Sequence, residues 1–117
     1  METSSTKEAL RRGIGKHIGM TVDDGAVSHI IRTSMAKVPD LSDEELEEIA
    51  EDRAAYLRFM MSSSKQVPSP VGWLITYIPQ AVSTEAVSAI RERKRKQTEE
   101  LERLTRELEE LKEGEGN

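Results

Sequence analysis

The C-terminal third of the chain has residues at alternating steps of three and four, a spacing that places them on one face of an α-helix. The repeat ends in four leucines, which we call the leucine ladder: Leu101, Leu104, Leu108 and Leu111. Upstream it continues through Gln97, Lys94, Ile90 and Val87. Ser83 and Thr84 supply a helix cap, so we predict one helix from about Glu85 to Lys112, roughly 40 Å long at about 1.5 Å per residue.

The leucine ladder has the register of a coiled coil and is our candidate interface for a partner helix. With Leu101 at heptad position a, Glu107 falls at g and Lys112 at the following e, where the two can pair across a parallel dimer. The leucine portion spans less than two heptads, whereas a secure coiled coil shows about three or four. Self-association, docking of the leucines on this chain's own helices, and a simply solvated helix all remain open.

Five of the six residues just before the ladder are basic, although the net charge of the chain is −5. We call residues 91–96 the basic block, and its candidate nucleic-acid-binding residues are Arg91, Arg93, Lys94, Arg95 and Lys96. A basic region followed by a leucine seam is the order found in zipper-type DNA-binding proteins. The recognition pattern of those proteins is absent, so the block predicts sequence-independent contacts to DNA phosphates.

The basic block also has other interpretations. It can be a solvated face, or it can bind an acidic protein surface. The chain itself has such a surface, because residues 40–52 hold eight acidic side chains and no basic one. This acidic run is most simply interpreted as a means of keeping the protein soluble, and mimicry of nucleic-acid charge is its other interpretation.

Residues 1–83 are predicted to form a small helical bundle, and no segment alternates apolar and polar residues as a strand does. Helices are indicated over about residues 6–18, 22–37 and 43–62, and from Pro70 onward. Their start signals are the pairs Ser5 and Glu8, Thr21 and Asp24, Ser42 and Glu45, and Ser69 and Pro70. The fold class is therefore all-α, with a bundle over residues 1–83 and a basic and leucine-bearing helix with a frayed end over residues 84–117.

Glycine, proline and tryptophan residues add further expectations about these helices. Gly13, Gly15 and Gly19 are expected to weaken the first helix, and we favour poor helicity over close backbone approach as their meaning. Pro79 lacks the backbone donor that a helix interior needs, so we expect a kink or break near residues 76–78. Trp73 is the largest apolar side chain, and we expect it to be largely buried against the third helix.

The sequence lacks the usual signs of catalysis, metal binding or membrane insertion. There is no cysteine, and His17 and His29 each stand alone, so we expect no metal, no cofactor and no catalytic residue, and hence no enzyme. No apolar run reaches the roughly 20 residues of a membrane span. The first residues lack the basic start and apolar segment of a signal peptide, and we expect a cytoplasmic protein with no membrane partner.

One segment resembles a known family. Its residues are Pro70, Val71, Gly72, Trp73, Leu74 and Ile75, followed by Ile78 and Pro79. This segment is similar to one near the C-terminus of bacterial and phage replication-initiator-like helix-turn-helix proteins, where it leads into a charged helical tail. The resemblance covers about residues 40–100. Ser69 stands where the family usually has Asn, and the winged helix that reads DNA is missing.

The resemblance implies a link to DNA replication or transcription control, with Trp73 and Leu74 as packing residues. Together with the basic block and the leucine ladder, it leads to our first hypothesis. This is a non-enzymatic accessory module of bacterial or phage origin that binds DNA weakly and forms a homodimer or pairs with a helical protein. The second hypothesis is a protein–protein interaction adaptor that binds no nucleic acid.

Overall fold

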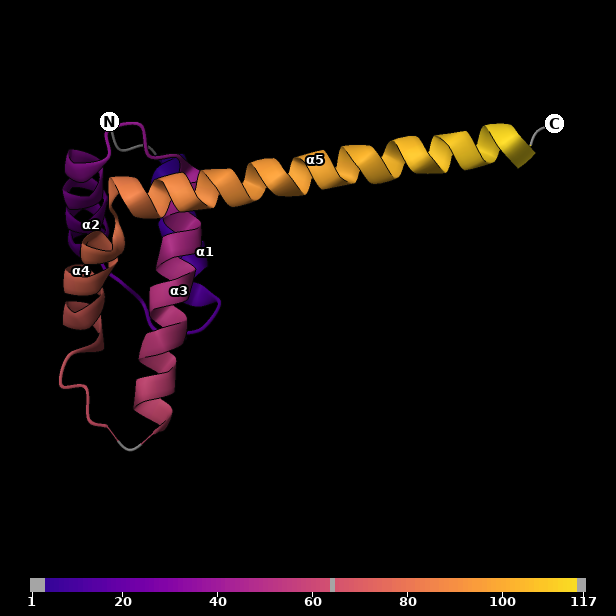
Figure 1. The fold of residues 1–117 in the computed structure, drawn as a ribbon. Coiled ribbons are helices and arrows are strands. Elements are labelled where there is room, and N and C mark those ends of the chain that lie inside the picture. The colour runs from indigo at the N-terminus through magenta and orange to yellow at the C-terminus, as the bar shows by residue number, and fades with distance from the viewer. Residues whose placement is uncertain (1–3, 64, 116–117) are drawn as a thin grey trace. The chain divides into compact units, whose positions relative to one another are not determined.

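The computed structural model describes residues 4–63 and 65–115, which form five α-helices and no strand (Figure 1). The helices are α1 (Ser4–Gly15), α2 (Asp24–Lys37), α3 (Asp43–Ser62), α4 (Pro70–Ala81) and α5 (Thr84–Glu115). The predicted all-α fold and long C-terminal helix are confirmed. Of the predicted frayed end, residues 114 and 115 belong to α5, and residues 116–117 lie outside the described residues.

The chain divides into two units, residues 1–87 and residues 88–117, so α5 contributes its first turn to the first unit. That turn belongs with the bundle because Val87 is almost fully buried there. The sequence predicts this boundary at residues 83–84, between the cap and the helix. Val87 therefore serves the core of the first unit and not the leucine-bearing part of the repeat.

The core of the first unit is aliphatic. Its largest fully buried side chains include Leu10, Ile14, Ile30, Ile31, Leu46, Leu57, Leu74 and Ile78. Helix α1 packs along α3, and α2 packs along α4, while α3 also contacts α4 (Figure 1). None of the four aromatic residues of the chain is among the buried core residues, and three of them are exposed. The hydrophobic core therefore consists of aliphatic side chains.

Local signals set most of the helix ends. Ser42 and Glu45 form the predicted capping box of α3, which explains why the Glu45 carboxylate is buried: it accepts the Ser42 backbone N–H at 2.9 Å. Ser69 caps α4 as predicted. Two signals were wrong. Asp23, rather than Thr21, caps α2, and α1 already begins at Ser4, which puts Ser5 inside the helix.

Pro79 does not break α4. The expectation was a kink or a break near residues 76–78, and the helix runs without a break through these residues to Ala81. Pro79 lacks the N–H that would bond the Ile75 carbonyl, but it lies in the last turn, so only two residues follow it within the helix and one helix hydrogen bond is lost. The Pro79 carbonyl accepts two hydrogen bonds, from Lys37 Nζ at 2.7 Å and from the Val82 N–H at 3.1 Å. These bonds satisfy the end of α4.

Gly13 is a place where the backbones of α1 and α3 approach closely. A Cβ atom added at Gly13 would lie 2.5 Å from the Glu47 backbone oxygen and 3.0 Å from the Ala50 Cβ. Glycine is required wherever backbones approach this closely. The interpretation of Gly13 as a mark of poor helicity is therefore wrong, because the residue serves close packing. A Cβ at Gly15, two residues later, would meet nothing within 4 Å.

Ion pairs lie along the same contact. Arg12 pairs with Glu47 at 2.9 Å, and Lys16 pairs with both Glu47 and Glu51 at 3.2 Å. The numbers rise together on the two helices, so α1 and α3 run in the same direction. Hydrogen bonds to Glu51 and then to Glu47 raise the pKa of Lys16 above its ordinary value. Two carboxylates of the acidic run are thus paired with Arg12 of α1 and with Lys16, which follows α1.

Asp43 closes the N-terminal end of this contact. It accepts hydrogen bonds from the Ser5 hydroxyl and from the Thr6 hydroxyl, the latter at 2.7 Å. These two bonds, Ser5 first, lower the pKa of Asp43 below its ordinary value. These two bonds therefore stabilise the folded protein at pH values above the ordinary pKa of Asp43. This stabilisation is lost as the pH falls through the lowered pKa.

Gly13 and Gly15 provide a matched test of this packing. We expect Gly13→Ala to destabilise the first unit by about 1–3 kcal/mol, because overpacking exceeds the roughly 1 kcal/mol that alanine gains in a helix. Gly15→Ala should be neutral or stabilising by up to about 1 kcal/mol, because its Cβ enters open space. Urea unfolding followed by far-ultraviolet circular dichroism measures both. Equal effects of the two substitutions would contradict the close contact.

Candidate interaction surfaces

The leucine ladder lies exposed on α5. Leu101, Leu104, Leu108 and Leu111 are 64%, 43%, 60% and 64% exposed. At about 100° per residue, all four fall within roughly 80° of the helix circumference. The structure therefore brings these predicted residues onto one continuous apolar stripe of the second unit.

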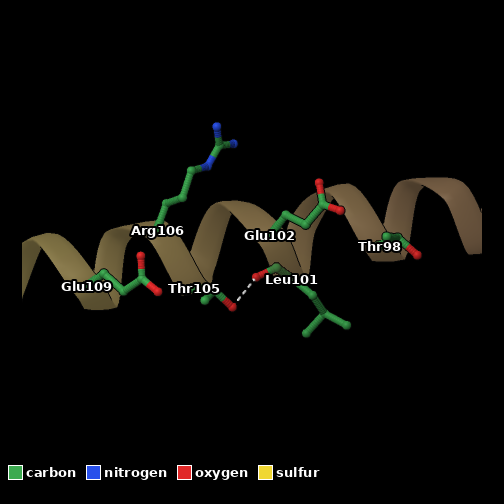
Figure 2. Close-up of a pocket in the computed structure, with 6 residues that line it drawn as sticks. All are labelled: Thr98, Leu101, Glu102, Thr105, Arg106 and Glu109. Atoms are coloured by element: carbon green, nitrogen blue, oxygen red, sulfur yellow. Dashed lines mark hydrogen bonds between the residues drawn. The ribbon is translucent and has the colours of Figure 1, made fainter.

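Short side chains border one side of this stripe. The hydroxyls of Thr98 and Thr105 donate back to the carbonyls of Lys94 and Leu101, at 3.0 and 2.8 Å. Figure 2 shows the Leu101 side chain pointing away from the helix beside Thr105. These residues line a shallow hollow together with Glu102, Arg106 and Glu109. Because one helix forms the whole hollow, it cannot enclose a small molecule, and it suits a side chain of a second helix.

The charged residues beside the ladder pair within α5. Arg103 bonds to Glu100 and lies 3.6 Å from Glu107, one turn to either side. Such pairs at steps of three and four support an exposed helix by about 0.2–0.5 kcal/mol each. These pairs help to explain why a helix that is charged on its other faces is stable. The charged side chains are thus paired within α5, whereas the four leucines of the stripe are exposed.

The basic block is exposed over its whole length, but its cations do not form one patch. At about 100° per residue, Arg91, Arg93, Lys94, Arg95 and Lys96 point to all sides of α5. Arg95 is bonded to both Glu92 and Glu99, and its hydrogen bonds lower the pKa of Glu92. Arg91 and Arg93 also interact with other groups. One nucleic-acid strand can therefore meet only some of the five cations.

A third surface, which the sequence does not predict, lies where α3 and α4 meet. Tyr56 of α3 stacks on Trp73 of α4, with ring centroids 6.0 Å apart and 21° between the planes. The Tyr77 ring, also on α4, lies 4.7 Å from the Trp73 ring and is tilted by 38°. The Arg53 guanidinium lies 5.2 Å from the centre of the Tyr56 ring. We call these four residues the aromatic ladder.

Trp73 is of intermediate burial and is not one of the core residues, and its predicted contact with the third helix is confirmed. The core stripe of α4 consists of Leu74 and Ile78 and continues to Val82, and Trp73 precedes Leu74 by one residue. One residue is about 100° of rotation, which turns Trp73 toward the edge of the contact. The available signal was composition, because all four aromatic residues of the chain lie between positions 56 and 77.

The histidines form no larger cluster among the described residues. His17 Nε2 lies 3.6 Å from Glu51, and His29 is exposed on α2. Across residues 4–63 and 65–115, no three histidine or acidic side chains gather as metal ligands would. In the same part of the chain, no helix is both long and apolar enough to cross a membrane.

Comparison of the chain with family models, curated proteins and solved structures finds no match. The resemblance of residues 70–79 to replication initiators therefore stays a prediction. Leu74 and Ile78 of that segment are buried core residues, which gives the motif a packing role in this fold.

Leu104 is the central residue for testing the leucine ladder. We expect Leu104→Lys to abolish self-association, because it places a charge in the middle of the apolar stripe. Helicity should be retained, since lysine and leucine have similar helix propensities. Ala89→Lys is the matched control, because it adds the same charge at an exposed position off the stripe. Sedimentation velocity compares the three proteins, and wild-type protein that stays monomeric at high concentration would remove the ladder as a self-association site.

Proposed function

We propose that this protein is a non-enzymatic assembly module that joins two copies of the chain through the leucine ladder. The observation that carries this proposal is an unbroken stripe of four exposed leucines on an otherwise charged helix. Burying apolar surface is the main driving force of association. Because the ladder spans less than two heptads, we expect a dissociation constant on the order of micromolar rather than nanomolar.

Charge favours a parallel dimer. In a parallel pair, g positions meet the following e positions of the second copy, so Glu107 meets Lys112. In an antiparallel pair centred on the ladder, g meets g, which sets Glu107 of one copy against Glu107 of the other. The Glu107 contact with Arg103 is long, at 3.6 Å, so Glu107 can turn to Lys112 at little cost.

Single cysteines test this arrangement, because the natural chain has none. We expect Leu111→Cys to form a disulfide-linked dimer under mild oxidation, since equivalent d positions come within bonding distance in a parallel pair. Glu109→Cys is the control and should stay uncrosslinked, because position b faces outward. In an antiparallel pair centred on the ladder, the two introduced thiols of Leu111→Cys would be roughly 15 Å apart.

Non-reducing electrophoresis at low protein concentration distinguishes the outcomes. Crosslinking only between Leu101→Cys and Leu111→Cys chains in a mixture would overturn the parallel orientation. Absence of every crosslink, together with monomeric sedimentation, would overturn self-association and leave pairing with a different helical protein as the adaptor alternative.

A second proposed activity is weak binding of DNA by the basic block. Parallel pairing favours it, because the pairing would bring two blocks to the same level just before the leucines. Lys94 occupies an a position, so two copies repel each other there, and a phosphate backbone between them relieves that repulsion. Since the cations point to all sides and Arg95 is internally paired, we expect about two to four phosphate contacts per chain.

The setting of this activity is likewise proposed. The resemblance of residues 70–79 supports an accessory role in DNA replication or transcription control, in the cytoplasm of a bacterium or of a phage host. The adaptor alternative assigns the basic block to an acidic protein surface and predicts no binding to a duplex.

Neutralising two cations inside the basic block, and two outside it as a control, distinguishes DNA binding from the adaptor alternative. We expect Arg93→Gln with Lys96→Gln to weaken binding to an arbitrary duplex, and to reduce its salt dependence, because two phosphate contacts are lost. Arg103→Gln with Arg106→Gln changes the net charge equally outside the block and should have much less effect. Gel shifts over a range of salt concentrations provide the measurement. No shift at micromolar wild-type protein and low salt would favour the adaptor.

A further inference from the structure

The aromatic ladder is a surface that the core does not explain. In a small domain, aromatic side chains usually fill the interior, since each buries about 150–250 Å². Here Tyr56, Phe59 and Tyr77 are 47%, 67% and 38% exposed. Phe59 follows Tyr56 by three residues and so lies on the same face of α3. Aromatic side chains gathered at the surface mark binding sites rather than packing.

The hydrogen-bonding groups of this surface are unused. Tyr56 Oη, Tyr77 Oη and Trp73 Nε1 form no hydrogen bond with any other described residue. The rings present an apolar body with a polar edge, which is the form of side chain that dominates contact sites. A partner must therefore supply apolar groups together with hydrogen-bond acceptors.

Charge argues against a nucleic acid here. The one cation of the ladder, Arg53, is bonded to Asp52 at 2.8 Å, which leaves little positive charge for phosphates.

The exposed area favours a short segment over a folded partner. With roughly 200 Å² for each aromatic residue, the exposed parts of Tyr56, Phe59 and Tyr77 amount to roughly 300 Å². A stable interface between globular proteins needs about 800 Å² on each partner. A second copy docking here alone would bury too little, whereas an extended peptide of a few residues fits this area.

We propose that the aromatic ladder binds a proline-rich peptide in the polyproline II conformation. Such a peptide has no internal backbone hydrogen bonds, so its carbonyls are free to accept from the tyrosine hydroxyls and the indole N–H. Its proline rings are flat and apolar, and they pack against exposed aromatic rings. Because polyproline II is preformed, little conformational entropy is lost on binding, and a small surface suffices.

The test uses the full chain and a polyproline peptide of about ten residues, long enough for roughly three turns of the helix. Trp73 is the only tryptophan, so its fluorescence reports binding at the site itself. We expect a saturable change on titration, and Tyr77→Ala should weaken binding by roughly 10–30-fold, because it removes both a ring and a donor. Tyr77→Phe, which keeps the ring, should show an intermediate loss.

Two controls make the result specific. Met61→Ala removes an apolar side chain that is 45% exposed and lies about 140° around α3 from Tyr56, and it should leave binding unchanged. Leu104→Lys should also bind normally, which separates this surface from the self-association of α5. No fluorescence change with polyproline would overturn the proposal. A response to a short thymidine oligonucleotide in place of polyproline would also overturn it, in favour of base stacking.

Discussion

The direct contact of the α1 and α3 backbones at Gly13 is the constraint on which the bundle depends. It sets two helices side by side in the same direction, and chain connectivity then requires the segment between them, which holds α2, to return to the starting end. Ion pairs from Arg12 and Lys16 follow the contact on one side, and the Asp43 carboxylate closes its beginning. Each of these polar groups is partly exposed and contributes modestly, whereas the glycine determines whether the two helices can meet at all.

Many of the charged side chains that suggest a charged binding partner in the sequence form ion pairs within the chain itself. Glu47 and Glu51 of the acidic run pair with Arg12 and Lys16, and Arg95 of the basic block pairs within its own helix. Apolar groups show the opposite behaviour. The leucine ladder of α5 and the aromatic residues of α3 and α4 lie outside the core. Both of the surfaces that we propose for protein partners are therefore apolar, even though a third of the residues are charged.

The sequence predicts well the features that depend on residues close together in the chain. The Ser42 and Glu45 box, the Ser69 cap and the heptad spacing of the leucines depend on residues within one or two turns, and all three are found in the structure. What it misses depends on distant residues. The role of Gly13 needs the Glu47 backbone, and the stack on Trp73 needs Tyr56 of another helix. Ser34 likewise falls on the buried face of α2, where its hydroxyl finds no partner among the described residues.

The aliphatic core has a consequence for spectroscopy. The tryptophan and both tyrosines lie on or beside the surface of α3 and α4, so the interior of the first unit holds no near-ultraviolet chromophore. Intrinsic fluorescence and near-ultraviolet dichroism thus report on one edge of the domain, while far-ultraviolet dichroism reports on all of its helices. Disagreement between these signals would mean that the aromatic edge had opened while the aliphatic interior stayed closed.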